Sequence, residues 1–170
     1  DFIDYLKKNL PNAEWCYDEK KDAMDTFLRA MKMAGDDPCI HMEDDIILTK
    51  DFMNKAIKVI TQKPFNLIQF FSMRKADLTI GSRWDRTFMM NQCHYNPQTY
   101  SRKIYEFYEI WEGKKEHPYG YDTMMQEWLK LRKEKYWISV PSLVEHRVAK
   151  SMIDSRRSSK RQSRTFKDGI

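Results

Sequence analysis

Three consecutive carboxylates, Glu43, Asp44 and Asp45, are the residues of this sequence best placed to do chemistry. Mostly apolar residues precede the triplet at 39–42 and follow it at 46–48, so the three charges are embedded among residues expected to be buried. Adjacent carboxylates repel one another, and a hard divalent cation such as Mg²⁺ or Mn²⁺, shared with substrate phosphates, would offset that repulsion. The alternative is a solvated turn before a helix, but the apolar flanks favour a metal site.

Basic side chains form two further groups in a chain whose formal net charge is +5. The first group occupies nine positions near the C-terminus and consists of Arg156, Arg157, Lys160, Arg161 and Arg164. The second group lies in residues 73–87, which show no clear hydrophobic period and are expected to form an irregular loop, and consists of Arg74, Lys75, Arg83 and Arg86. Such groups are either solvated surface or phosphate-binding segments.

The composition is that of one globular domain. With 170 residues, of which 41% are hydrophobic, the chain is long enough to bury a core. The three cysteines are widely spaced and form no CxxC pair, which favours free thiols in a reducing compartment over disulfides or a zinc site. No stretch reaches the roughly 20 apolar residues of a membrane helix, and no signal peptide is visible. We therefore expect a cytoplasmic protein without a transmembrane segment.

Hydrophobic periodicity predicts the elements that position these side chains. The expected helices span residues 18–34, 49–62, 97–113 and 122–134, the first ended by Gly35 and the second capped by Thr49. The expected strands span residues 39–42, 66–71, 88–95 and 136–140. This alternation predicts an α/β domain with a mostly parallel sheet flanked by helices. Ligands of such sheets bind beyond the carboxyl ends of the strands, where the acidic triplet lies.

The segment around the triplet resembles a known family. Residues 40–46 (IHMEDDI), followed by Asp51 and Phe52, are similar to the LEDDV…F signature of GT-A glycosyltransferases. The likeness is closest to small bacterial and phage enzymes related to the lipopolysaccharide type, family 25. Later segments follow in the same order: residues 97–109 (PQTYSRKIYEFYE), an acid at a helix start, and residues 141–146 (PSLVEH), which resemble the PSLVxH close of such enzymes. The resemblance covers about residues 18–166.

The resemblance implies a Mn²⁺ or Mg²⁺ ion that bridges the diphosphate of a sugar nucleotide, most readily a UDP-sugar. Asp45 is then the first metal ligand and Asp44 the second. Glu43 lies either toward the ribose, where it contributes with Asp44 to donor binding, or just behind the metal ligands. His146 would be a further metal ligand, its neutral imidazole being suited to Mn²⁺. The alternative for His146 is a histidine that only packs against the last strand.

Transfer of a sugar also needs a base that takes the proton of the acceptor hydroxyl. The resemblance implies Asp122 in that role, with Glu127 as the substitute, although Asp122 is explained equally well as a helix cap. Residues 151–170, rich in serine and arginine, would close over the donor diphosphate as a lid. The residues expected to contact the donor there are Ser151, Arg156, Arg157, Lys160 and Arg161.

GT-A domains normally begin with a strand, a helix and a second strand that build the uridine pocket, and no first strand is visible here. We therefore expect an N-terminally abbreviated GT-A-like catalytic domain over residues 1–150, either because an N-terminal part is missing or because the nucleotide pocket is short.

The favoured function is transfer of a sugar to a hydroxymethylated base in phage DNA, in the host cytoplasm, with Arg74, Lys75, Arg83 and Arg86 on the acceptor side. Within the same enzyme class, the rival acceptor is a surface glycan or lipopolysaccharide, where a basic tail could dock on anionic headgroups. Two other classes stay open: a metal-dependent nuclease and a non-catalytic nucleic-acid-binding module. The oligomeric state is left open.

Overall fold

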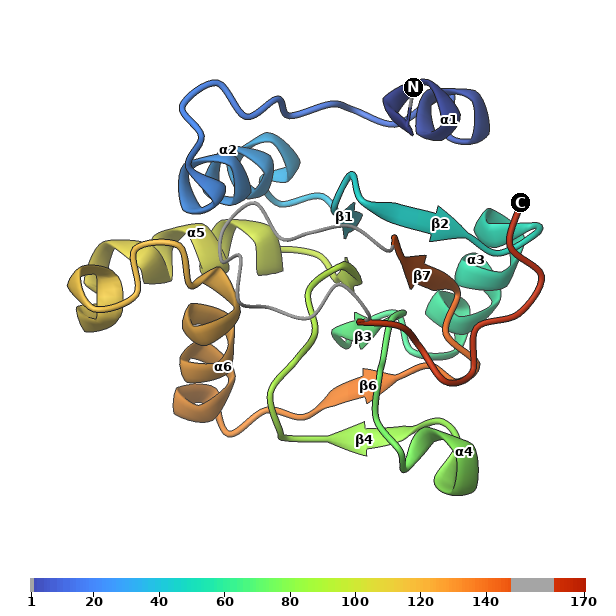
Figure 1. Cartoon of the computed structure of the whole chain (residues 1–170). Helices are drawn as coiled ribbons and strands as arrows, with labels where there is room; N and C mark the ends of the chain where they lie inside the picture. Colours follow the sequence, from blue (N-terminus) through green and yellow to red (C-terminus); the bar gives the residue numbers. More distant parts are fainter. Residues whose placement is uncertain (1, 148–160) are drawn as a thin grey trace.

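The computed structural model describes residues 2–147 and 161–170 and has a central five-stranded sheet (Figure 1). Its strand order is β1-β5-β3-β6-β4. The strands are β1 (Cys39–Met42), β5 (Cys93–Asn96), β3 (Ile68–Gln69), β6 (Tyr136–Ile138) and β4 (Arg83–Asp85). Only β3 and β6 run parallel, whereas β1 with β5, β3 with β5 and β4 with β6 are antiparallel.

The α/β class is therefore confirmed, but the predicted mostly parallel sheet is wrong. Helix–strand alternation predicts parallel strands, because a single helix between two strands returns the chain to the end of the sheet at which the first strand began. In this protein β5 and β6 run in opposite directions, since β5 is antiparallel and β6 parallel to β3. Here two helices, α5 (Tyr100–Ile110) and α6 (Tyr121–Arg132), separate β5 from β6. A short 3-10 helix, η1 (Glu112–Lys115), lies between them. Residues 73–87 are likewise not an irregular loop, because they contain α4 (Asp77–Ile80) and the edge strand β4.

Three helices gather at one end of the sheet and build the larger core (Figure 1). The first, α2 (Ala23–Ala34), starts at Asp22, whose carboxylate accepts from two backbone N–H groups, and ends at Gly35 with φ +56°. Glycine adopts that left-handed conformation without steric cost, as the sequence predicted. Buried side chains of α2, α5 and α6 meet there, among them Phe27, Ile104 and Trp128.

A second, smaller sheet lies at the other end of the molecule, where β2 (Ile46–Leu48) pairs antiparallel with β7 (Val144–His146). Helix α3 (Phe52–Gln62) and helix α1 (Phe2–Asn9), which periodicity did not predict, pack near it around a second core that includes Leu6, Ile46 and Phe70. None of the helices in the described residues is both long and apolar enough to cross a lipid bilayer.

The predicted cap of α3 is wrong. Asp51, not Thr49, occupies the cap position. Thr49 is buried, pairs with Gly169 in an isolated bridge and donates its hydroxyl to the carbonyl oxygen of Lys167 at 3.0 Å. The last residues of the chain, 168–170, thus lie beside the end of β2, where the backbone N–H groups of Lys50 and Ile170 donate to the carbonyl oxygens of Asp168 and Leu48 (Figure 1).

Candidate metal centre

The acidic triplet forms the connection between β1 in the large sheet and β2 in the small one. Because Ile46 pairs with His146 in the β2–β7 ladder, the residue before Ile46 comes next to the histidine. The backbone N–H of Arg147 donates to the carbonyl oxygen of Asp45 at 2.7 Å and fixes this register. One ligand atom each of Glu43, Asp45 and His146 lie within 4.8 Å of one another.

The imidazole of His146 is oriented as a ligand. Its Nδ1 lies 2.7 Å from the carbonyl oxygen of Arg147, and a carbonyl can only accept, so Nδ1 carries a proton. In the neutral ring Nε2 then has a free lone pair, and it lies 3.1 Å from Oδ2 of Asp45. Two lone pairs at that distance repel unless a proton or a cation lies between them. A backbone carbonyl that holds the distal nitrogen is also the usual support of a metal-binding histidine.

Protonation of His146 is one way to satisfy this contact. Burial lowers the pKa of His146, but the hydrogen bond and charge of Asp45 raise it, with a net rise above the ordinary value. The other carboxylate oxygen of Asp45, Oδ1, is buried and has no hydrogen-bond partner among the described residues. A proton on the histidine leaves that oxygen unsatisfied, whereas a divalent cation would engage the carboxylate and the imidazole together.

Glu43 is held by the start of α6. The hydroxyl of Tyr121 donates to Oε1 of Glu43, and the ring of Tyr121 stacks on Phe27 with centroids 4.6 Å apart. Burial, together with the charge of Asp45, raises the pKa of Glu43 to about 8. A carboxyl of this kind keeps its proton near neutral pH until a nearby cation displaces it. The two carboxylates and the imidazole therefore fit a hard or borderline divalent ion.

Asp44 lies outside this group. Its side chain is exposed, and burial of part of the carboxylate together with the charge of Asp45 raises its pKa. The sequence placed Asp44 in the metal site and Glu43 beside it, whereas the geometry brings Glu43 to the cluster and directs Asp44 to the surface.

Asp122 lies beside the cluster on the first turn of α6. Its Oδ1 accepts a hydrogen bond of 2.9 Å from Nδ2 of the fully buried Asn91, and its charge contributes to the raised pKa of Glu43. The cap position of α6 is Gly120, so Asp122 is not there as a helix cap. Glu127, the predicted substitute, accepts from the indole Nε1 of Trp111 at 2.7 Å and is not among the residues of the cluster.

The C-terminal segment reaches the site through Arg161. Ser151, Arg156, Arg157 and Lys160 lie outside the described residues. Arg161 is half-buried, its charge opposes protonation of His146, and its Nε has no hydrogen-bond partner among the described residues. Glu145 anchors this segment, since its Oε1 accepts from the backbone N–H groups of His146 and Ser163, both at 2.8 Å.

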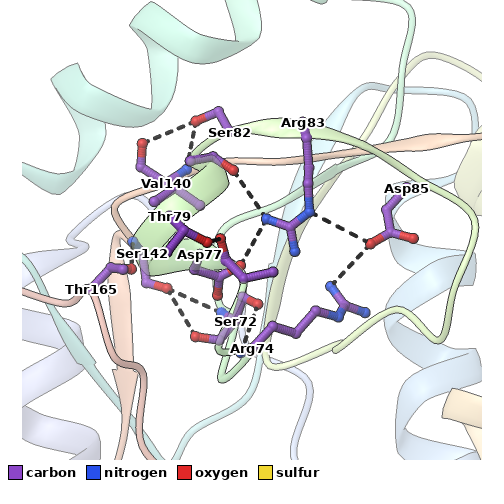
Figure 2. Close-up of polar contacts among 12 residues, drawn as sticks. Ser72, Arg74, Asp77, Thr79, Ser82, Arg83, Asp85, Val140, Ser142 and Thr165 are labelled. Carbon is purple, nitrogen blue, oxygen red and sulfur yellow. Dashed lines mark hydrogen bonds and ion pairs between the residues drawn. The ribbon is translucent and has the colours of Figure 1, made fainter.

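Two of the four predicted acceptor-side cations are engaged inside the protein. Figure 2 shows Arg83 between Asp77 and Asp85, with the closest contact 2.9 Å from Nη1 to Oδ1 of the fully buried Asp77. Arg74 donates to the carbonyl oxygen of Phe88. Figure 2 shows its second contact, with Asp85.

Both guanidinium groups therefore hold β4 and its neighbouring turns. Lys75 and Arg86 remain exposed.

Sequence reasoning missed Tyr121 and Asn91, which position Glu43 and Asp122. Tyr121 directly precedes the predicted base, a signal that could have found it, whereas nothing in the sequence marks Asn91.

No protein-family model matches the chain, and no curated protein or solved structure shows a significant similarity to it.

Proposed function

We propose that this protein is a metal-dependent glycosyltransferase that uses a nucleoside diphosphate-sugar, with a UDP-sugar as the expected donor. The observation that carries the proposal is the cluster of Glu43, Asp45 and His146, whose ligand atoms lie within 4.8 Å of one another at the end of β1. Two carboxylates and an imidazole suit Mn²⁺ or Mg²⁺. When bound, the ion would supply the positive charge that stabilises a departing diphosphate.

The residues around the cluster have separate tasks in this reaction. Asp45 and His146 would hold the ion together with Glu43, which Tyr121 orients. Arg161, with a buried Nε that lacks a partner among the described residues, is available to donate to a diphosphate oxygen. The basic residues that precede Arg161 in sequence, Arg156, Arg157 and Lys160, are proposed to act with it on the donor.

Asp122 is the proposed general base. It accepts the proton of the acceptor hydroxyl while the hydroxyl oxygen bonds to the anomeric carbon of the sugar. The bond from that carbon to the diphosphate oxygen breaks, and the diphosphate leaves with the electron pair. Asn91 holds Oδ1 of Asp122 at 2.9 Å and so directs the carboxylate. The hydrogen bond from Trp111 to Glu127 gives Glu127 a different task, linking α6 to the end of α5.

For the acceptor we propose DNA that carries a hydroxymethylated base, as the positive net charge of +5 suggests. A glycan acceptor is the other outcome of the experiment.

A donor screen tests the proposal. The full chain is incubated with UDP- and GDP-sugars and Mn²⁺, with and without hydroxymethylated DNA, and release of the nucleoside diphosphate is measured by chromatography. We expect one donor to be hydrolysed, with hydrolysis abolished by EDTA and accelerated by the modified DNA.

Metal-dependent cleavage of DNA without turnover of any donor would instead identify a nuclease. If the protein neither turns over a donor nor cleaves DNA but still binds DNA, it would be a non-catalytic binding module.

A further inference from the structure

A groove lined by cations lies on the side of the molecule where α6 ends and β6 begins. It consists of two adjoining hollows of about 250 and 320 Å³ that share Glu134 in their walls. We call it the basic groove and define it by Trp84, Arg86, Lys130, Lys133, Glu134 and Lys135.

The basic groove lies away from the candidate metal centre. The triplet follows Met42, which pairs with Cys93 at the start of β5. Because β3 runs antiparallel to β5, and β6 parallel to β3, the starts of β3 and β6 lie at the opposite end of the sheet. Lys135 directly precedes β6, and Trp84 belongs to the edge strand β4, beside β6 (Figure 1).

The cations of the groove are available to a ligand. Arg86, Lys130, Lys133 and Lys135 are exposed, and none of them makes an ion pair with another residue in the described ranges. The only acid in the lining, Glu134, is already bound, because its Oε1 accepts from Arg132 and from the hydroxyl of Tyr100. The groove therefore presents four unneutralised positive charges, which attract a polyanion.

An aromatic side chain stands in the same groove. Trp84 is 41% exposed, and its indole packs edge-on against Trp137 with centroids 5.2 Å apart. The ammonium of Lys63 lies 4.0 Å from the ring centroid of Trp137 and 5.0 Å from that of Trp84. Trp84 is thus held from two sides on a strand, with part of its ring left open to a ligand.

We propose that the basic groove binds single-stranded nucleic acid, with Trp84 stacking on a base and the four cations contacting phosphates. An exposed aromatic ring among cations is the usual composition of single-strand sites. A duplex hides the faces of its bases, so it could not use Trp84, and a neutral glycan would leave the four charges unused. The role of the groove in binding a nucleic-acid acceptor rests on the proposed function. Its affinity for an oligonucleotide does not depend on that function.

Binding is tested with the full chain and a fluorescently labelled 12-mer of deoxythymidine, by anisotropy between 50 and 300 mM salt. If four phosphates are contacted, log K should fall with log salt at a slope of about −2.8, since single strands contribute about −0.7 per phosphate. Trp84→Ala should weaken binding about tenfold, and Trp84→Phe should restore most of it. Lys133→Ala with Lys135→Ala should flatten the slope by about 1.4.

The matched control is Lys8→Ala with Lys50→Ala, two exposed lysines, one on α1 and one shortly after β2. Both of these elements lie on the opposite side of the molecule from the start of β6 (Figure 1). The control should leave both affinity and slope unchanged. Equal losses in the two double variants would show charge attraction without a site, and would overturn the proposal, as would unchanged binding in Trp84→Ala. Donor hydrolysis is measured on the same variants, and its persistence in Trp84→Ala separates failure of the groove from failure of the metal centre.

Discussion

Substitution of Asp45 by Asn tests the metal centre most directly. The change keeps the shape of the side chain but removes the charge that faces Nε2 of His146 at 3.1 Å and that helps to raise the pKa of Glu43. Without metal, Asp45→Asn should fold about as stably as the wild type near neutral pH, because the amide N–H that replaces Oδ2 can donate to the lone pair of Nε2 in the neutral ring of His146.

With metal bound, the wild type should become the more stable of the two proteins. A ligand at one hundred times its dissociation constant stabilises a protein by about 2.7 kcal/mol, and 1 kcal/mol raises the melting temperature of a chain of this size by about 2–4 °C. Mn²⁺ should thus raise the wild-type melting temperature by roughly 5–10 °C and leave Asp45→Asn almost unchanged. Loss of a catalytic ligand should also lower donor turnover at least ~100-fold, equivalent to about 2.7 kcal/mol.

The assay is thermal unfolding followed by fluorescence, with EDTA or Mn²⁺, beside donor hydrolysis on the same samples. Asp37→Asn is the matched control, because Asp37 is an exposed aspartate before β1 and should respond to Mn²⁺ like the wild type. An equal Mn²⁺ shift in Asp45→Asn and in the wild type would refute the assignment of Asp45. So would near-full activity of Asp45→Asn in EDTA.

Three further predictions concern neighbouring residues. Asp122→Asn should lower the rate constant of transfer in single-turnover kinetics but leave donor affinity nearly unchanged, and intact transfer would remove Asp122 from the role of base. The pKa of Glu43 is raised from 4.5 to about 8, so between these values the folded state keeps a proton that the unfolded state releases. In EDTA the free energy of unfolding should therefore fall as pH rises from 4.5 to 8, by at most about 1.4 kcal/mol per pH unit. Urea unfolding should show this fall weakened in Glu43→Gln, and an identical pH dependence in both proteins would contradict it. Arg83→Ala should destabilise the fold by roughly 3–5 kcal/mol because it leaves buried Asp77 without its ion pair; a stability close to that of the wild type in urea unfolding would argue that Arg83 is free to bind a ligand.

Local patterns predicted most of the helices and the place of the acidic triplet. Spacing of apolar residues located α3, α5 and α6 to within three residues at each end and placed the start of α2 five residues too early. It succeeded because an amphipathic face is a property of one short segment. The same reasoning failed for strand direction, since pairing depends on contacts between distant residues, such as Ile68 with Tyr95 in one ladder and with Trp137 in another.

The candidate metal centre, too, was predicted from the sequence only in part. The run of carboxylates after an apolar segment was enough to single out Asp45, and the resemblance of short motifs to those of GT-A enzymes singled out His146 and Asp122, because such patterns are visible in one dimension. Only the tertiary structure decided which carboxylates face the histidine. The β2–β7 register brings Asp45 to His146, and Tyr121 brings Glu43, while Asp44 points to the surface.

The basic side chains show most clearly what the sequence alone could not predict. In the sequence, Arg74 and Arg83 carry the same weight as Arg86, since all three are basic residues in one stretch. The fold places buried or half-buried acids beside the first two, so their charges are used internally, and leaves Arg86 on the surface with lysines from the end of α6. The amino-acid sequence determines how many charges the chain carries, but whether each charge meets a partner or the solvent depends on which distant segments the fold brings together.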